Sequence, residues 1–195
     1  SMSTIWVVKS LGIDPQTGKE VFVKKDGSLT YDWSSSDFIA GGDTRPKVSG
    51  NFGINMEYHG FGLNAGFTWR LGGQMYNTTL LDKVENADVH YNVDRRVFTG
   101  RWSEPGQVAR FKSITADSET KPTSRFVEDY NLLTFSSLNV YYDFRECRFM
   151  EKSFLQRMKA TFYMNDIATI SSVKTERGTS YPFARSFSFS LQVTF

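Results

Sequence analysis

Strict alternation of apolar and polar residues is the feature that most constrains this chain. From Phe61 to Leu71 every second residue is apolar, and glycine, asparagine, threonine or arginine stands between them. Asn51–Tyr58 and Ser186–Phe195 follow the same pattern. Successive side chains of a strand point to opposite faces, so the pattern predicts β-strands with one apolar and one polar face.

Two more segments alternate, and a third is weaker. Arg157–Asn165 carries one clear apolar face, and so does Leu132–Phe144, whose apolar positions change phase near Ser136-Ser137. One extra residue would restore that phase, so we predict a β-bulge there. Thr4–Ser10 is also expected to be a strand, although its apolar residues are consecutive and do not alternate.

The connections between these strands are alternately long and short. From the C-terminus backwards they span about 18, 12, 60, 2 and 40 residues, the pattern of outer-membrane barrels with short periplasmic turns and long extracellular loops. The two-residue link His59-Gly60 predicts a tight hairpin. Since such barrels end at the periplasmic face, we expect Phe195 and this hairpin there, and the two longest connections outside the cell.

Strand length favours a membrane barrel over a soluble protein. The expected strands have about 10–13 residues, against the five or six of globular sheets, and their polar faces carry few lysines or glutamates. No apolar run reaches the roughly 18–20 residues of a membrane helix. We therefore predict an all-β fold, an antiparallel up-and-down transmembrane β-barrel segment of about six strands. Six strands cannot close, because the smallest membrane barrels have about eight, so we expect a part of a larger barrel.

Other classes find less support in the sequence. The net charge is +2 and basic residues do not cluster, which argues against nucleic-acid binding. The single cysteine, Cys147, excludes an internal disulfide framework. A soluble carbohydrate-binding β-sandwich remains the alternative, since it also alternates, and a surface adhesin or passive porin fragment is a third possibility.

A family resemblance is spread over residues 4–195. The segments that carry it are Gly12–Glu20 (GIDPQTGKE), Thr44–Lys47 (TRPK) with Gly50, Leu71–Asn77 (LGGQMYN), Arg125–Asp129 (RFVED), Met164–Asp166 (MND) and Glu176–Ser186 (ERGTSYPFARS). Their order and spacing resemble the C-terminal part of SusC/RagA-type TonB-dependent outer-membrane transporters of Bacteroidetes.

The resemblance implies more than the alternation does. It implies a 22-stranded barrel of the cell outer membrane, a plug and a TonB-contacting segment that are absent here, and energy supplied through the TonB complex. It also implies import of oligosaccharides or peptides under a SusD-type lipoprotein lid. We expect this chain, residues 3–195 behind an expression scar at 1–2, to be inactive alone and not to be an enzyme.

The connection at 72–130 carries the residues most suited to binding. Its aromatic side chains stand among charged residues, an arrangement that suits sugars or peptides. They could equally pack the connection against itself or contact the lid. The candidates for substrate or lid contact are Tyr76, Tyr91, Phe98 and Trp102.

We predict no catalytic, cofactor-binding or metal site. Asp82, Glu85 and Asp88 are spaced by three, so a helix would bring them to one face, but the calcium-loop signature is missing. His59 and His90 lie far apart in the sequence, and no nucleotide or hydrolase motif occurs. The resemblance also gives the final alternating run a role as the barrel-assembly signal, carried by Phe187, Phe189, Leu191, Val193 and Phe195.

Overall fold

The computed structural model describes residues 2–88, 90, 93, 95–116, 118–151, 154–173 and 186–195. It contains two compact units. The first, here the sheet unit, comprises Lys47–Leu71 and Asn131–Phe195; the second, the loop unit, comprises Ser1–Pro46 and Gly72–Tyr130.

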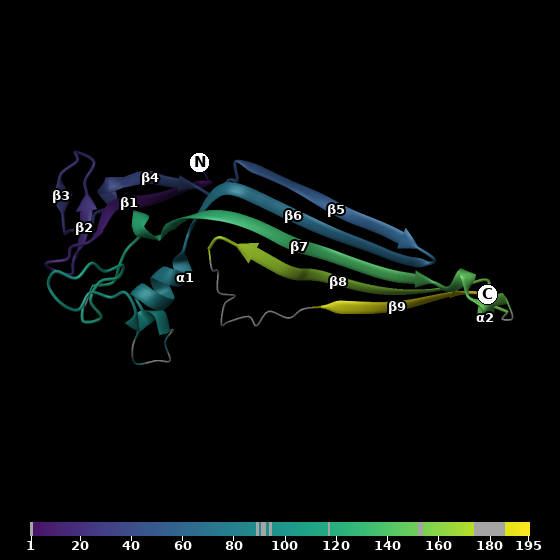
Figure 1. Ribbon diagram of the computed structural model, residues 1–195. Helices are drawn as coiled ribbons and strands as arrows, with labels where there is room; N and C mark the ends of the chain where they lie inside the picture. Colours follow the sequence, from purple (N-terminus) through teal and green to yellow (C-terminus); the bar gives the residue numbers. More distant parts are fainter. Residues whose placement is uncertain are drawn as a thin grey trace. The chain divides into compact units, whose positions relative to one another are not determined.

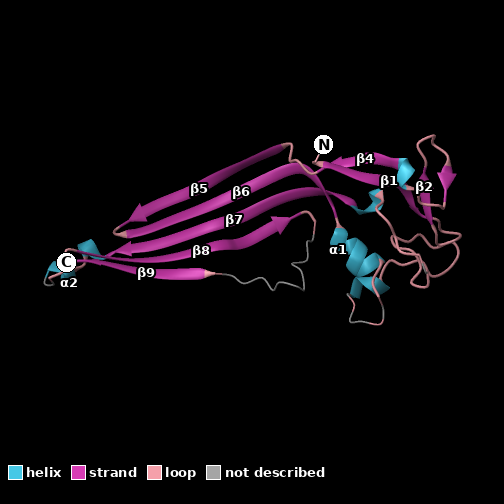
Figure 2. Ribbon diagram, turned by 180° about the vertical axis from the view of Figure 1, so that it is seen from behind, coloured by secondary structure: helices cyan, strands magenta, loops and turns pink. Residues whose placement is uncertain are grey.

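The sheet unit is built on one five-stranded sheet with the order β5-β6-β7-β8-β9. The strands lie side by side in a single layer in both views (Figures 1 and 2). They are β5 (Val48–Tyr58), β6 (Phe61–Tyr76), β7 (Val127–Asp143), β8 (Arg157–Ser171) and β9 (Phe187–Thr194). The order follows the sequence, as in an up-and-down barrel wall, and the predicted fold class is confirmed.

The hairpin between β5 and β6 forms where the sequence predicts it. His59 and Gly60 have φ values of 45° and 79°, the left-handed conformation that a two-residue turn between twisted strands requires. The carbonyl of Gly60 accepts a hydrogen bond from the backbone N–H of Asp143 at 2.7 Å. This bond ties the start of β6 to the end of β7.

The register brings the apolar residues of all five strands to one face. Phe52 of β5 pairs with Phe67 of β6 and stacks on it at 4.9 Å between ring centroids. Phe67 stacks in turn on Phe135 of β7 at 4.7 Å. Towards the other edge of the sheet, Phe162 of β8 pairs with Phe189 of β9. Alternation along each strand and pairing across strands therefore agree on a single apolar face.

The predicted irregularity near Ser136-Ser137 is confirmed. The pairing of β7 with β8 shifts between Phe135, opposite Ala168, and Ser137, opposite Asn165. Between these two pairs the chain advances by two residues on β7 and by three on β8. In this pair the extra residue therefore lies on β8 and not on β7, where the sequence predicted it. Asp166 lies in that stretch and has a φ of 49°.

The loop unit has a smaller sheet of its own, with the order β3-β2-β1-β4. Its strands are β1 (Thr4–Ile13), β2 (Glu20–Val23), β3 (Leu29–Thr30) and β4 (Phe38–Asp43). The segment at 4–10 is therefore a strand as expected, but it pairs in this sheet, and the long sheet has five described strands rather than about six. The segment belongs to the smaller sheet, and not to the long one, because consecutive residues of β1 are buried. Val7 and Val8 are both 1% exposed, which requires cover on both faces of β1.

Short helices complete the two units. The loop unit contains α1 (Thr78–Leu80), the π-helix η2 (Leu81–Glu85) and the 3-10 helices η1 (Ser35–Asp37), η3 (Arg95–Phe98) and η4 (Ser124–Phe126). The sheet unit contains η5 (Phe144–Glu146) and α2 (Arg148–Glu151). Within the described residues, no helix is long and apolar enough to span a membrane.

A hydrophobic cluster gives the long connection a core of its own. It comprises Leu80, Leu81, Val84, Phe111 and Phe126, with Tyr76 packed against it. The described part of the connection between β6 and β7 is therefore folded around its own core. Such packing accounts for a connection of this length between two neighbouring strands.

Candidate functional site

The apolar face of the long sheet exposes large hydrophobic side chains on several strands. Phe52 is 52% exposed, Phe189 is 69% exposed and Ile170 is 69% exposed. Full burial of one such side chain contributes roughly 1.5–3 kcal/mol, and whole domains are stable by only about 5–15 kcal/mol. If these apolar side chains stayed uncovered in water, the fold would lose hydrophobic stabilisation comparable to the whole free energy of unfolding. The face therefore needs an apolar environment.

The opposite face of the same sheet is polar and closely fitted. Tyr141 lies directly over Gly62, where a side chain on β6 would collide with its ring. The ammonium group of Lys159 lies 3.8 Å from the centre of the same ring, a cation–π contact. The hydroxyl of Ser136 donates to the carbonyl of Gly66 at 2.9 Å. Glycines on β6 thus provide the space for larger side chains on β7.

The final alternating run places its aromatic residues on the apolar face. Phe187, Phe189 and Leu191 are exposed, and Val193 is half-buried opposite Met158. Phe195 follows β9 and stacks on Phe154 at 5.8 Å, with the two rings nearly parallel. The residues predicted as the assembly signal therefore lie along one edge of the sheet, and all of them except Val193 are exposed.

The four aromatic residues predicted for substrate or lid contact have different surroundings. Tyr76 packs on Phe126 at 6.2 Å within the core of the loop unit. The indole N–H of Trp102 donates to the carbonyl of Pro15 at 2.8 Å. Phe98 is 67% exposed, and Tyr91 lies outside the described residues. Phe98 is thus the described member of the set that presents most of its ring to a partner.

A buried ion-pair network holds the loop unit together. Arg125 donates to both carboxylate oxygens of Glu20, from Nε at 2.8 Å and from Nη2 at 2.7 Å. Nη2 also donates to Oε1 of Glu85 at 2.8 Å. The exposed fractions of the three side chains are 10%, 6% and 0%. The network joins η4, β2 and η2, three elements far apart in the sequence.

The charge pairing decides the protonation of Arg125. Burial alone lowers the pKa of its guanidinium group, but the hydrogen bonds and charges of Glu20 and Glu85 more than offset burial. Its pKa therefore lies above the ordinary value, and the group stays charged. Buried ion pairs of this kind are costly to break from one side, because the remaining charge is left without a partner.

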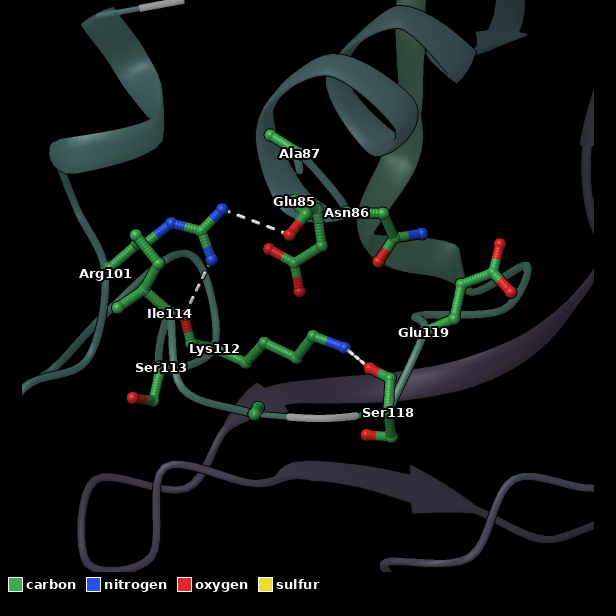
Figure 3. Close-up of a pocket in the computed structure, with 10 residues that line it drawn as sticks. Glu85, Asn86, Ala87, Arg101, Lys112, Ser113, Ile114, Ser118 and Glu119 are labelled. Atoms are coloured by element: carbon green, nitrogen blue, oxygen red, sulfur yellow. Dashed lines mark hydrogen bonds between the residues drawn. The ribbon is translucent and has the colours of Figure 1, made fainter. Parts of the chain in front are cut away.

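A polar pocket of about 230 Å³ lies beside this network (Figure 3). Arg101 donates to the carbonyls of Glu85 at 3.0 Å and of Lys112 at 3.1 Å, and also to those of Val84 and Val97. It thereby fixes two pocket-lining segments to each other. Burial lowers the pKa of the Lys112 ammonium group below its ordinary value.

The three acidic residues noted at spacing three do not converge. Glu85 is buried and bound to Arg125, whereas Asp82 and Asp88 are exposed. Among the described residues, no group of three or more histidine, cysteine, aspartate or glutamate side chains could hold a metal ion. His59 instead lies 3.5 Å from a carboxylate oxygen of Glu146.

The ion-pair network and the pocket were not predicted from the sequence. Glu20 and Arg125 both fall in segments that carry the family resemblance, but nothing in their local patterns indicates that they meet. A buried charged pair can be recognised only after the fold is known. The one available signal was the position of Glu20 in β2, next to apolar residues.

Comparisons with known proteins point in the same direction as the sequence motifs. No protein-family model matches the chain. The TonB-dependent receptor P3 of Formosa agariphila is 27% identical over 150 residues, which cover 77% of this chain and 14% of that protein. The chain thus spans about a seventh of the length of this curated relative.

Two solved structures show the same fold. The RagAB peptide importer in the 'open-open' state matches with a TM-score of 0.78 and 17% identity, over 98% of this chain and 22% of that one. A second structure, of the RagAB peptide transporter, matches with a TM-score of 0.70 and 17% identity, over 88% of this chain and 20% of that one. The soluble β-sandwich is not favoured, because the described sheet unit has one layer and its fold matches these two structures. By sequence the chain is similar to part of a TonB-dependent receptor, and by fold to part of the RagAB importer, as its motifs predicted.

Proposed function

We propose that the chain forms part of the wall of an outer-membrane transporter that takes up oligosaccharides or peptides. The observation that carries this proposal is the exposed apolar face of β5–β9, which no second layer covers within the described part of the sheet unit. The polar face would line the interior, and the edges of the sheet would pair with further strands of the same barrel, since open edges are not tolerated in lipid.

The ends of the strands support a proposed orientation in the membrane. The hairpin at His59-Gly60, the short connection through η5 and the C-terminal Phe195 lie at one end of the sheet (Figure 1). This end would face the periplasm, where barrel turns are short. The connection from Asn77 to Phe126 leaves β6 and enters β7 at their other ends, and would be extracellular.

The relatives support a proposal for the partners. The matched structure is named as that of a peptide importer, RagAB. By analogy, we propose that the complete protein works with a SusD-type surface lipoprotein as its lid and receives energy from the TonB complex through segments outside this chain. The aromatic residue Phe98, exposed in the connection, is the described candidate for contact with lid or substrate.

Uptake by cells tests the transport proposal. A strain that lacks the gene, complemented with the complete protein, should regain uptake of fluorescently labelled peptides or oligosaccharides, and a protonophore should abolish that uptake. The proposal fails if uptake of both substrate classes is the same with and without the gene.

The native cysteine tests the orientation independently. Cys147 lies just after η5 and is half-buried. In intact cells a membrane-impermeant maleimide should leave Cys147 unlabelled, and it should label Cys147 once the outer membrane is permeabilised. A cysteine placed at the exposed Ser103 in a Cys147→Ser background should be labelled in intact cells. The reverse pattern would overturn the proposed orientation.

A further inference from the structure

The pocket beside the ion-pair network contains a buried acceptor that no group satisfies. Oε1 of Glu85 accepts from Arg125 at 2.8 Å and from the hydroxyl of Thr120 at 3.2 Å. Oε2 of the same carboxylate is buried and has no hydrogen-bond partner in the structure. A buried charged oxygen without a donor is unfavourable, because it has lost its hydrogen bonds to water, so the site favours a ligand that brings a donor.

A donor group lies in the same pocket. Lys112 is 7% exposed, and its ammonium group donates to the backbone carbonyl of Ser118. An ammonium group has three N–H donors, so among the described contacts it retains capacity for a ligand. In Figure 3 the carboxylate of Glu85 and the side chain of Lys112 both reach into the pocket.

The half-buried polar side chains of the pocket are already engaged. Arg101 is bound to backbone carbonyls, as described above. Asn86 exchanges two hydrogen bonds with the backbone of Thr120, at 2.9 and 2.8 Å, and the hydroxyl of Ser113 is bonded to that of Thr115 at 2.9 Å. Ser118 and Glu119 also line the pocket, but both are exposed. Of the buried side chains, the pocket therefore offers a ligand Oε2 of Glu85 as an acceptor and Nζ of Lys112 as a donor.

The size and lining of the pocket select the chemical class. A volume of about 230 Å³ is below the roughly 300–1,000 Å³ of drug-sized sites, so it suits a group of a few heavy atoms. The opposite charges of Glu85 and Lys112 favour a neutral group with a donor and an acceptor. The lining residues include no aromatic ring, the feature that would hold a sugar face.

We propose that this pocket binds a carboxamide group, as found in a peptide bond or an asparagine or glutamine side chain. The amide N–H would donate to Oε2 of Glu85, and the amide oxygen would accept from Nζ of Lys112. The proposal goes beyond transport, because binding here requires only the folded loop unit and neither an energised membrane nor a closed translocation path.

Titration with a small neutral diamide tests the proposal. N-acetylglycinamide should bind the complete protein in detergent micelles at one site per chain, measured by isothermal titration calorimetry. Lys112→Met, which removes the donor but keeps much of the volume, should weaken binding at least tenfold. Lys83→Met is the matched control, because Lys83 is exposed, lies in η2 and does not line the pocket.

A second variant keeps the test decisive if Lys112→Met does not fold. Ile114 lines the pocket and is 45% exposed, so Ile114→Trp should occlude the space without touching the ion pairs, and should also weaken binding at least tenfold. No heat of binding to the unmodified protein, or equal binding to both pocket variants and to the control, would overturn the proposal. Equal binding of glucose at the same site would overturn the assignment to amides. Failure of transport leaves these outcomes unaffected.

Discussion

Arg125 holds Glu20 through two parallel hydrogen bonds of 2.8 and 2.7 Å, although the two residues are 105 positions apart in the sequence. This fork-to-fork geometry is the strongest form of an ion pair between side chains. It links η4, which leads into β7, to β2 of the smaller sheet. The stability of the loop unit should therefore depend on Arg125 more than on any exposed charge.

Arg125→Met should destabilise the loop unit by about 3–5 kcal/mol, because it leaves the carboxylates of Glu20 and Glu85 buried without a cation. Hydrogen–deuterium exchange should detect the change as faster exchange of the loop-unit amides, by roughly two orders of magnitude or more.

Arg110→Met is the control for this measurement. Arg110 pairs with Glu128 at 2.8 Å, but its side chain is 61% exposed, and exposed pairs contribute about 1 kcal/mol or less. Equal exchange rates in the two variants would contradict the role assigned to the buried network.

The contact of Gly62 with Tyr141 predicts a coupled pair on the polar face. A Cβ at position 62 would collide with the ring of Tyr141, so Gly62→Ala should lower the thermal stability of the barrel in detergent. In a Tyr141→Ala background the same substitution should be nearly neutral. A double-mutant cycle measures the difference, and an additive result would show that the two residues do not constrain each other.

Asp166 tests the bulge in β8. Its φ of 49° is a conformation that costs most residues about 1–2 kcal/mol and glycine nearly nothing. Asp166→Gly should therefore be neutral or stabilising, whereas Asp166→Ile should destabilise the barrel by at least that amount, as measured by thermal unfolding. If isoleucine is tolerated as well as glycine, the strand does not adopt this conformation in the membrane.

Neighbouring residues of β9 should respond in opposite ways to a charge. Phe189→Arg places a guanidinium group on the apolar face, at a cost of roughly 2–4 kcal/mol near the middle of a bilayer, and should reduce the yield of folded protein in liposomes. Ser190→Arg places the same group on the polar face and should leave the yield nearly unchanged. Heat-modifiable mobility in electrophoresis gives the folded fraction, and equal yields would contradict the assignment of the faces.

The long strands were predictable because alternation is a local property. Phe52, Phe67 and Phe189 lie on the face that the sequence assigned to them, and the phase change near Ser136-Ser137 indicated the register shift. The sequence assigned the extra residue to β7, whereas in the pairing with β8 it lies on β8, because the strand of the extra residue depends on how the two strands pair around Asp166.

The loop unit was less predictable, because its structure depends on contacts distant in the sequence. Val7 and Val8 are consecutive and both buried, so β1 is covered on both faces and lacks the alternation by which the other strands were predicted. The partners of Arg125 and the free oxygen of Glu85 become visible only when β2, η2 and η4 are brought together. Residue type alone did suggest the aromatic candidates, but it did not separate the packed Trp102 from the exposed Phe98.

Spin labels along β8 provide the most direct test of the central claim, that β5–β9 form a membrane wall. In a Cys147→Ser background, single labels at positions 158–164 of the complete protein in liposomes would be probed for collisions with oxygen and with a water-soluble nickel complex. We predict a period of two: Met158, Ala160, Phe162 and Met164 accessible to oxygen but not to nickel, and Lys159, Thr161 and Tyr163 protected from oxygen. Uniform accessibility to nickel along the strand would contradict the account.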